Sequence, residues 1–200
     1  HTTFTAEEIH KGRTRLKYRR GEKVISSCLT VVDDGTLPWR LGTVPFDDER
    51  VPPVPRRLVE DGVVSGCLHN LKTSALWSEE PTGNGFRGSL ASTPVPGPSN
   101  LFILQGPDPI DSLLPGSTTI RFSGLMGAHT IDRVSGDFSL GASGYILEGG
   151  EVTRPFRNGA VSGNLFDLMA RLAAVGDDLT FYGSLGSPSL LFDKVILSGA

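Results

Sequence analysis

The clearest folding signal of the sequence is the segment Arg57-Leu58-Val59-Glu60-Asp61-Gly62-Val63-Val64-Ser65-Gly66-Cys67-Leu68. Two runs with apolar and β-branched residues flank Asp61-Gly62, a dipeptide that favours the two-residue turn in which both central residues take a positive φ. The segment therefore predicts an antiparallel β-hairpin.

A second hairpin is predicted where Tyr145-Ile146-Leu147-Glu148 and Glu151-Val152-Thr153-Arg154 flank Gly149-Gly150. Other segments are rich in residues that suit a half-buried pleated surface, and in residues 13–19 charge alternates with Leu16 and Tyr18. We expect further strands at 13–19, Val24–Val32, Leu101–Gln105, Thr118–Phe122, Asp137–Leu140, Leu179–Tyr182 and Leu190–Leu197.

Two or three short helices interrupt the strands. Thr5 and Glu8 have the spacing of a capping box. Asp108, followed by proline, predicts a short helix that reaches Leu114. The best helical periodicity runs from Asn164 to Val175.

The composition indicates a folded chain that is dominated by sheet. The 200 residues include 25 glycines and 14 prolines, which favour turns and strands over long helices. No apolar run approaches the roughly 18 residues that a membrane span requires. We predict that residues 1–200 form a single α+β domain, mostly antiparallel β-sheet in a sandwich or barrel-like arrangement, with two or three short helices.

Residue 1 and the two cysteines bear on the origin and the cellular location of the chain. Residue 1 is His, so we expect a piece of a longer protein. Cys28 and Cys67 cannot form a disulfide framework, which favours a reducing, cytoplasmic location.

Charge is unevenly distributed along the chain. The net charge is −3, yet residues 1–23 carry seven basic and three acidic side chains. A solvated strand face, or a surface for an acidic partner, explains the basic run of residues 11–23 better than DNA binding, because Tyr18 is the only aromatic within that run. We expect neither a nucleic-acid nor a membrane partner.

The sequence carries none of the common catalytic signatures. It has no His-Glu-x-x-His, Cys-x-x-Cys, Walker loop or Gly-x-Ser-x-Gly. Cys67 and His69 share one side of an expected strand, but two ligands do not make a metal site, so both are assigned structural roles. We interpret Asp33-Asp34 with Gly35 as a turn, and Asp47-Asp48-Glu49 as a solvated loop.

Residues 81–100 form a long expected loop that begins with Pro81-Thr82-Gly83-Asn84-Gly85. Glycines around an asparagine allow backbone N–H groups to face a ligand, although an ordinary turn has the same composition. Thr82, Asn84 and Asn100 are the candidate residues of a peptide groove or an interface, since we expect free polar side chains in this region.

Several strings together resemble the C-terminal domain of the TldD/PmbA family, in which PmbA is also called TldE and older names are modulators of DNA gyrase. Their order and spacing match over nearly the whole chain, and Arg50 departs from the pattern, where the family often has glycine. The strings are Gly21–Val24, Val31–Pro38, Phe46–Glu49, Val59–Gly62, Pro81–Gly85, Ser135–Ser139, Gly144-Tyr145, Gly163–Leu165, Val175–Leu179 and Gly183–Ser189.

The resemblance implies a two-part protease system that acts on small or partly unfolded peptides. The catalytic member carries a His-Glu-x-x-x-His helix upstream of this region and a cysteine near its C-terminus, and together they hold zinc. Its partner keeps the fold without these ligands. In this chain Leu185 and Gly186 stand where the cysteine is expected.

The resemblance therefore predicts a PmbA/TldE-like domain with no catalytic residue, no metal ligand and no cofactor of its own. Its expected partners are a TldD-like paralogue or a second copy, and peptide substrates. One alternative is the C-terminal part of an active metallopeptidase whose histidine helix lies before residue 1. Another is a peptide-binding module without proteolysis.

Overall fold

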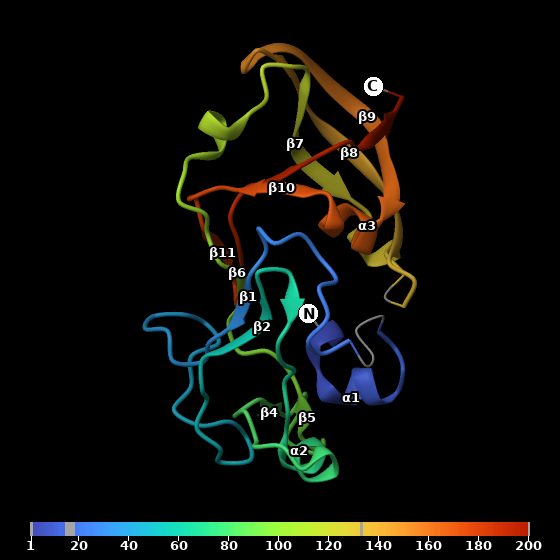
Figure 1. Ribbon diagram of the computed structural model, residues 1–200. Helices are drawn as coiled ribbons and strands as arrows, with labels where there is room; N and C mark the ends of the chain where they lie inside the picture. Colours follow the sequence, from blue (N-terminus) through green and yellow to red (C-terminus); the bar gives the residue numbers. More distant parts are fainter. Residues whose placement is uncertain (1, 15–18, 133, 200) are drawn as a thin grey trace.

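The computed structural model describes residues 2–14, 19–132 and 134–199 and shows a sheet-rich molecule (Figure 1). Its largest sheet has the strand order β11-β12-β6-β1-β2-β3. These strands are β1 (Val31–Asp33), β2 (Arg56–Glu60), β3 (Val63–Val64), β6 (Leu101–Ile103), β11 (Thr180–Tyr182) and β12 (Leu185–Ser187).

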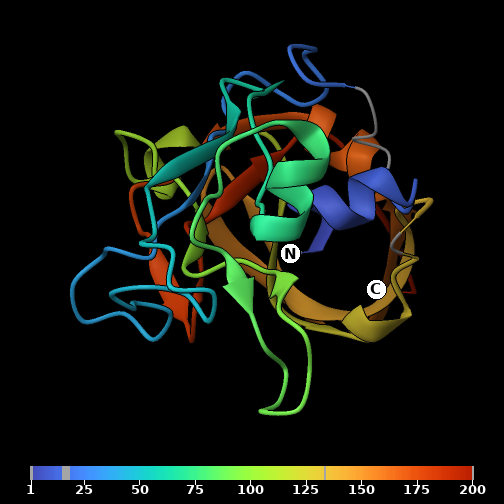
Figure 2. The same ribbon diagram turned by 90° about the horizontal axis from the view of Figure 1, so that it is seen from below.

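A second sheet has the order β14-β9-β8-β7, and it curves around one side of the molecule when seen from below (Figure 2). Two smaller sheets pair β10 with β13 and β4 with β5. These strands are β4 (Gly85–Phe86), β5 (Val95–Pro96), β7 (Thr119–Met126), β8 (Asp137–Glu148), β9 (Glu151–Asn164), β10 (Leu172–Val175), β13 (Leu190–Phe192) and β14 (Ile196–Ser198).

The helices are short and lie between the strands. The α-helices α1 and α2 lie at the end of the molecule opposite the four-stranded sheet (Figure 1). The helical elements are the 3-10 helices η1 (Thr2–Phe4), η2 (Ile110–Leu113) and η3 (Ala128–Thr130), and the α-helices α1 (Ala6–His10), α2 (Leu71–Trp77) and α3 (Leu165–Ala170). The predicted α+β class is confirmed, although no sheet closes into a barrel over the residues described.

Both predicted hairpins are present. Asp61 and Gly62 have φ angles of 48° and 80°, and Gly149 and Gly150 have φ angles of 59° and 89°. Positive φ at both central positions gives the turn a twist that matches the flanking strands. The second hairpin extends well beyond its prediction because β8 and β9 pair from Glu148↔Glu151 back to Asp137↔Asn164.

Two hydrophobic clusters form the main core. One lies under the six-stranded sheet and includes Leu58, Val59, Leu68, Leu172 and Val175. The other lies on the curved sheet around Leu140, Ala142, Phe156 and Val161. The hairpin predicted first thus contributes central residues of the larger cluster.

Three predictions from the sequence need correction. The helix expected from Asn164 to Val175 ends at Ala170, and its second half is β10, because Leu172 and Val175 pack in the core beside the six-stranded sheet. Only the end of the expected strand Val24–Val32 is a strand. The expected strand Leu190–Leu197 is divided into β13 and β14 around Lys194, which has a φ of 57°.

One helix, α2, was not predicted from the sequence. Asn70 accepts a hydrogen bond from Thr73 N at 2.9 Å, and Asn70 N donates to Thr73 Oγ1 at 3.1 Å, so this pair forms a capping box for α2. By contrast, Thr5 precedes α1 without the expected capping bond. The expected basic strand 13–19 lies partly outside the described residues.

Candidate functional site

The position where the resemblance places a metal-ligating cysteine lies inside the six-stranded sheet. Leu185 and Gly186 belong to β12, which pairs in parallel with β6 and antiparallel with β11. A Cβ atom on Gly186 would lie 2.8 Å from Phe102 Cβ and 3.0 Å from Phe181 Cζ. Since real Cβ atoms essentially never come within 2.8 Å of another heavy atom, the two aromatic residues would have to shift to admit any side chain here.

A pocket of about 310 Å³ lies beside Leu185 and Gly186. Strands β1, β6 and β12, helix α3 and the N-terminal segment form its walls. The lining residues are Thr3, Phe4, Ile25, Leu29, Val31, Leu101, Phe102, Ile103, Leu165, Phe166, Met169, Leu185 and Gly186.

This apolar pocket is chemically unsuited to a metal ion. Zinc in proteins is held by thiolate, imidazole or carboxylate groups, and none of the lining side chains carries one. In the part of the chain that the structure describes, no group of three or more His, Cys, Asp and Glu side chains could hold an ion. The zinc that the resemblance implies for the catalytic member therefore does not fit the residues at this position.

Asp33, at the end of β1, is the centre of a buried polar network. Its side chain is 2% exposed and accepts hydrogen bonds from Ser99 N, Ser99 Oγ and Asn84 Nδ2, each at 2.8 Å. Burial raises the pKa of this carboxyl, and the hydrogen bonds from Asn84 and Ser99 partly oppose the rise. The network joins β1 to the two ends of the 81–100 region.

The candidate residues Thr82, Asn84 and Asn100 are all buried, so the expectation of free polar side chains is wrong. Asn100 accepts from Gly42 N at 2.9 Å and donates to Asp34 O at 2.8 Å. Thr82 Oγ1 accepts from His69 N at 2.9 Å and lies 3.0 Å from His69 O. Their side chains hold loops together, and a role for them in a peptide groove or an interface stays a prediction.

The acidic loop after Phe46 is also corrected, because Asp47 is buried rather than solvated. Its Oδ1 accepts from the backbone N–H groups of Glu49 and Val51, and its Oδ2 accepts from Gly85 N at 2.8 Å. Asp34 does serve as a turn residue, since its Oδ1 accepts from Thr36 N at 2.8 Å. Sequence reasoning recognised these carboxylates but not that two of them face inward.

Cys67 and His69 form a buried pair, in keeping with their predicted structural roles. Cys67 Sγ lies 3.1 Å from His69 Nε2, and the ring of Trp77 packs edge-on against the imidazole. Burial raises the pKa of Cys67 to about 11 and lowers the pKa of His69, so at neutral pH the thiol is protonated and the imidazole is neutral.

This pair does not have the geometry of an activated nucleophile. In a catalytic triad the acid and the nucleophile contact different nitrogens of the histidine. Here Glu79 Oε2 lies 3.5 Å from the same Nε2 that Cys67 contacts. The raised pKa of the thiol also leaves little thiolate for reaction.

The fold and the site together define a class of protein: a sheet-rich chain with an apolar pocket where the resemblance places a cysteine. A family model described as the PmbA/TldA metallopeptidase C-terminal domain matches residues 1–199. The chain belongs to this family, which confirms the resemblance seen in the sequence.

Individual relatives and solved structures agree. A metalloprotease TldD homolog from Haemophilus influenzae is 30% identical over 194 residues, which cover 90% of this chain and 40% of the relative. A structure from Thermotoga maritima is named as a modulator of a DNA gyrase. It matches this chain with a TM-score of 0.91 and 33% identity, and the match covers 98% of this chain and 45% of that chain.

The structure of TldE from Thermococcus kodakarensis gives a TM-score of 0.88 with 27% identity, and covers 98% of this chain and 46% of that chain. The chain thus spans less than half the length of these relatives. No helix among the described residues is long and apolar enough to cross a membrane.

Proposed function

We propose that this chain is the C-terminal domain of a PmbA/TldE-like subunit, which shapes a peptide-binding cavity and a subunit interface without hydrolysing peptides by itself. The observation that supports the proposal is that Leu185 and Gly186, which stand where the resemblance places a metal-ligating cysteine, border an apolar pocket. Its partner would be a TldD-like paralogue or a second copy of the chain.

The pocket suits the apolar side chain of a peptide. Its volume of about 310 Å³ can hold a large aliphatic or aromatic side chain, and its walls are almost entirely carbon. Leu185 is 45% exposed, so it can contact a ligand at the mouth as well as the sheet beneath it.

Zinc, which by resemblance belongs to the catalytic partner, would supply a polarised water there. The contribution of this chain is different. The packing of Gly186 between Phe102 and Phe181 fixes the position of β12, and the buried network around Asp33 fixes the loops at the end of the neighbouring strand. A rigid wall of this kind lowers the entropy cost of holding a peptide.

The test combines metal, cleavage and binding measurements on the purified chain. With Zn²⁺ and an unstructured peptide rich in Leu and Phe, we expect no cleavage and no stoichiometric zinc. We expect peptide binding that a chelator does not change. Leu185→Asp should weaken that binding about tenfold, because it places a charge at an apolar mouth.

Leu125→Asp is the matched control, since Leu125 is 51% exposed on β7 and does not line the pocket. Tight one-to-one zinc binding, or cleavage that a chelator abolishes, would contradict the proposal and favour an active metallopeptidase. Equal losses of peptide affinity in the two variants would show that the peptide does not bind in the pocket beside Leu185.

A further inference from the structure

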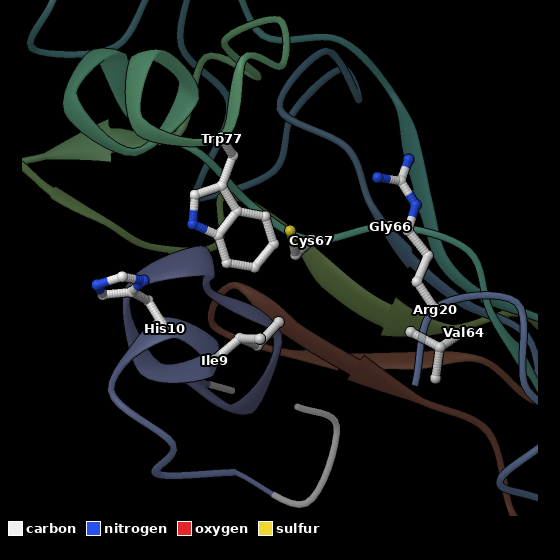
Figure 3. Close-up of a pocket in the computed structure, with 7 residues that line it drawn as sticks. All are labelled: Ile9, His10, Arg20, Val64, Gly66, Cys67 and Trp77. Carbon is white, nitrogen blue, oxygen red and sulfur yellow. The ribbon is translucent and has the colours of Figure 1, made fainter. Parts of the chain in front are cut away.

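A second pocket, of about 450 Å³, lies between α1, α2 and the first hairpin (Figure 3). It shares no lining residue with the pocket at Leu185. The residues that line it are Ile9, His10, Arg20, Val64, Gly66, Cys67 and Trp77.

The walls of this second pocket are apolar, and its polar side chains are all able to donate. Ile9, Val64 and the indole of Trp77 supply the apolar surface. Figure 3 shows the guanidinium of Arg20 on one side of the pocket and the rings of Trp77 and His10 on the other. No carboxylate lines the pocket, so its polar groups are suited to a ligand with acceptor oxygens.

Arg20 is oriented by two contacts that leave part of its guanidinium for a ligand. Its Nη1 donates to Glu79 Oε1 at 2.6 Å, and its Nε donates to Ser65 O at 3.3 Å. Among the contacts of the described residues, Nη2 has no hydrogen-bond partner. A planar guanidinium held in this way can donate to a carboxylate with little further loss of freedom.

The charges that act on the buried Cys67 in the pocket wall have a positive balance. Arg20 and Arg56 both act on Cys67 and favour its ionised form, while Glu79 opposes it. Arg56 packs close to Gly66 in the pocket wall, since a Cβ on Gly66 would lie 3.6 Å from Arg56 Cδ. The Nε of Arg56 is buried without a hydrogen-bond partner. Two guanidinium groups against one carboxylate favour an anionic ligand.

We propose that this second pocket binds an amphiphilic carboxylate, with its carboxylate at Arg20 and its aromatic or branched apolar body against Trp77, Ile9 and Val64. Two sources share this chemistry: the C-terminal residue of a peptide with a free carboxylate, and a free aromatic acid. The proposal does not depend on the function proposed for the pocket at Leu185.

Trp77 provides a direct reporter for the test. The chain has two tryptophans, and Trp39 is fully exposed, so Trp39→Phe leaves Trp77 as the single fluorophore. In this background we titrate acetyl-Ala-Ala-Phe with a free carboxylate, the same peptide as its C-terminal amide, and 3-phenylpropionate. We expect a saturable change of emission with at least one of the two acids, and at least tenfold weaker binding of the amide.

Variants separate the charge from the fold. Arg20→Gln should weaken the acid at least tenfold, whereas Arg19→Gln, on the neighbouring exposed arginine that pairs with Glu22, should leave binding unchanged. Glu79→Gln removes the opposing charge and should strengthen binding. Far-UV circular dichroism checks that each variant is folded. His10 also lines the pocket, and His10→Ala leaves the Arg20–Glu79 pair intact, so this variant is a second test in which we expect a loss of affinity.

The outcomes decide between the two sources and can overturn the site. Tighter binding of the peptide acid identifies a peptide C-terminus, and tighter binding of 3-phenylpropionate identifies a free acid. No saturable binding of either acid, equal binding of acid and amide, or an unchanged affinity in folded Arg20→Gln would each overturn the proposal.

Discussion

The network around Asp33 and the pocket beside Leu185 lie on the same six-stranded sheet, yet they use opposite chemistry. At the end of β1, a carboxylate and two asparagines are buried and hydrogen-bonded to loops. Two strands away, β12 presents leucine and glycine to an apolar pocket. Residues with reactive functional groups therefore serve the scaffold, and residues without them line the surface that we assign to peptide binding.

The largest effect should come from removing the centre of the polar network. Asp33→Ala removes the acceptor of Ser99 N and Ser99 Oγ and one of the two acceptors of Asn84 Nδ2, and we expect a loss of about 3–5 kcal/mol in the free energy of unfolding, measured with urea. Asp111→Ala is the control, because this exposed carboxylate pairs with Arg121 at the surface and should cost less than about 1 kcal/mol. Equal costs would remove the distinction between scaffold and surface.

A smaller loss is expected in the wall of the apolar pocket. Gly186→Ala places a methyl group against Phe102 and Phe181, and we expect about 1–3 kcal/mol of destabilisation from overpacking. Gly116→Ala has no neighbour within 4 Å and should be neutral or slightly stabilising. A neutral Gly186→Ala would show that the pocket wall is pliable, and would weaken the case for a preorganised peptide site.

The dependence of stability on pH should have opposite signs at two aspartates. The pKa of Asp33 is raised in the folded state, mainly by burial, so its contribution falls as pH rises from the unfolded pKa through the folded one. The pKa of Asp178 is lowered by hydrogen bonds from the Ser189 hydroxyl and backbone, so its contribution is present above the unfolded pKa and is lost as pH falls through the folded value.

Urea unfolding between pH 3 and 7 measures both effects. Relative to the parent chain, Asp33→Asn should be less harmful at pH 7 than at pH 3, and Asp178→Asn should be more harmful at pH 7. If the two variants shared one trend, the buried carboxyl of Asp33 would not differ electrostatically from the exposed carboxyl of Asp178 that accepts from Ser189.

The smallest effect concerns Trp39, whose side chain is fully exposed and whose φ is 61°. The loop around it is anchored by Asn100 rather than by the indole. Trp39→Gly relieves the positive φ but loosens the unfolded chain, and we expect a gain of at most about 0.5 kcal/mol. Trp39→Ala keeps the strain and should change little; a clear loss in either variant would show that the indole contributes to folding.

The elements that depend on neighbouring residues were predictable. Asp61-Gly62 and Gly149-Gly150 form their turns because the requirement for a positive φ is local, and the family resemblance could be recognised from motifs in order along the chain. The segment from Leu172 to Val175 was predicted as helix because its periodicity is ambiguous over so few residues. Its position in the core of the larger cluster decided in favour of strand.

The candidate residues show the same division. Sequence alone identified Thr82, Asn84, Asn100 and the carboxylates as polar groups within turn-forming loops. The family resemblance placed Leu185 and Gly186 where a metal-ligating cysteine is expected. Only the tertiary structure decided that the first group faces inward and that β6 and β11 enclose Gly186, since these contacts join residues up to 84 positions apart, as in the pairing of Gly186 with Phe102. Turn geometry is set by the residues that form it, whereas burial and cavity shape depend on distant segments that come together only when the chain folds.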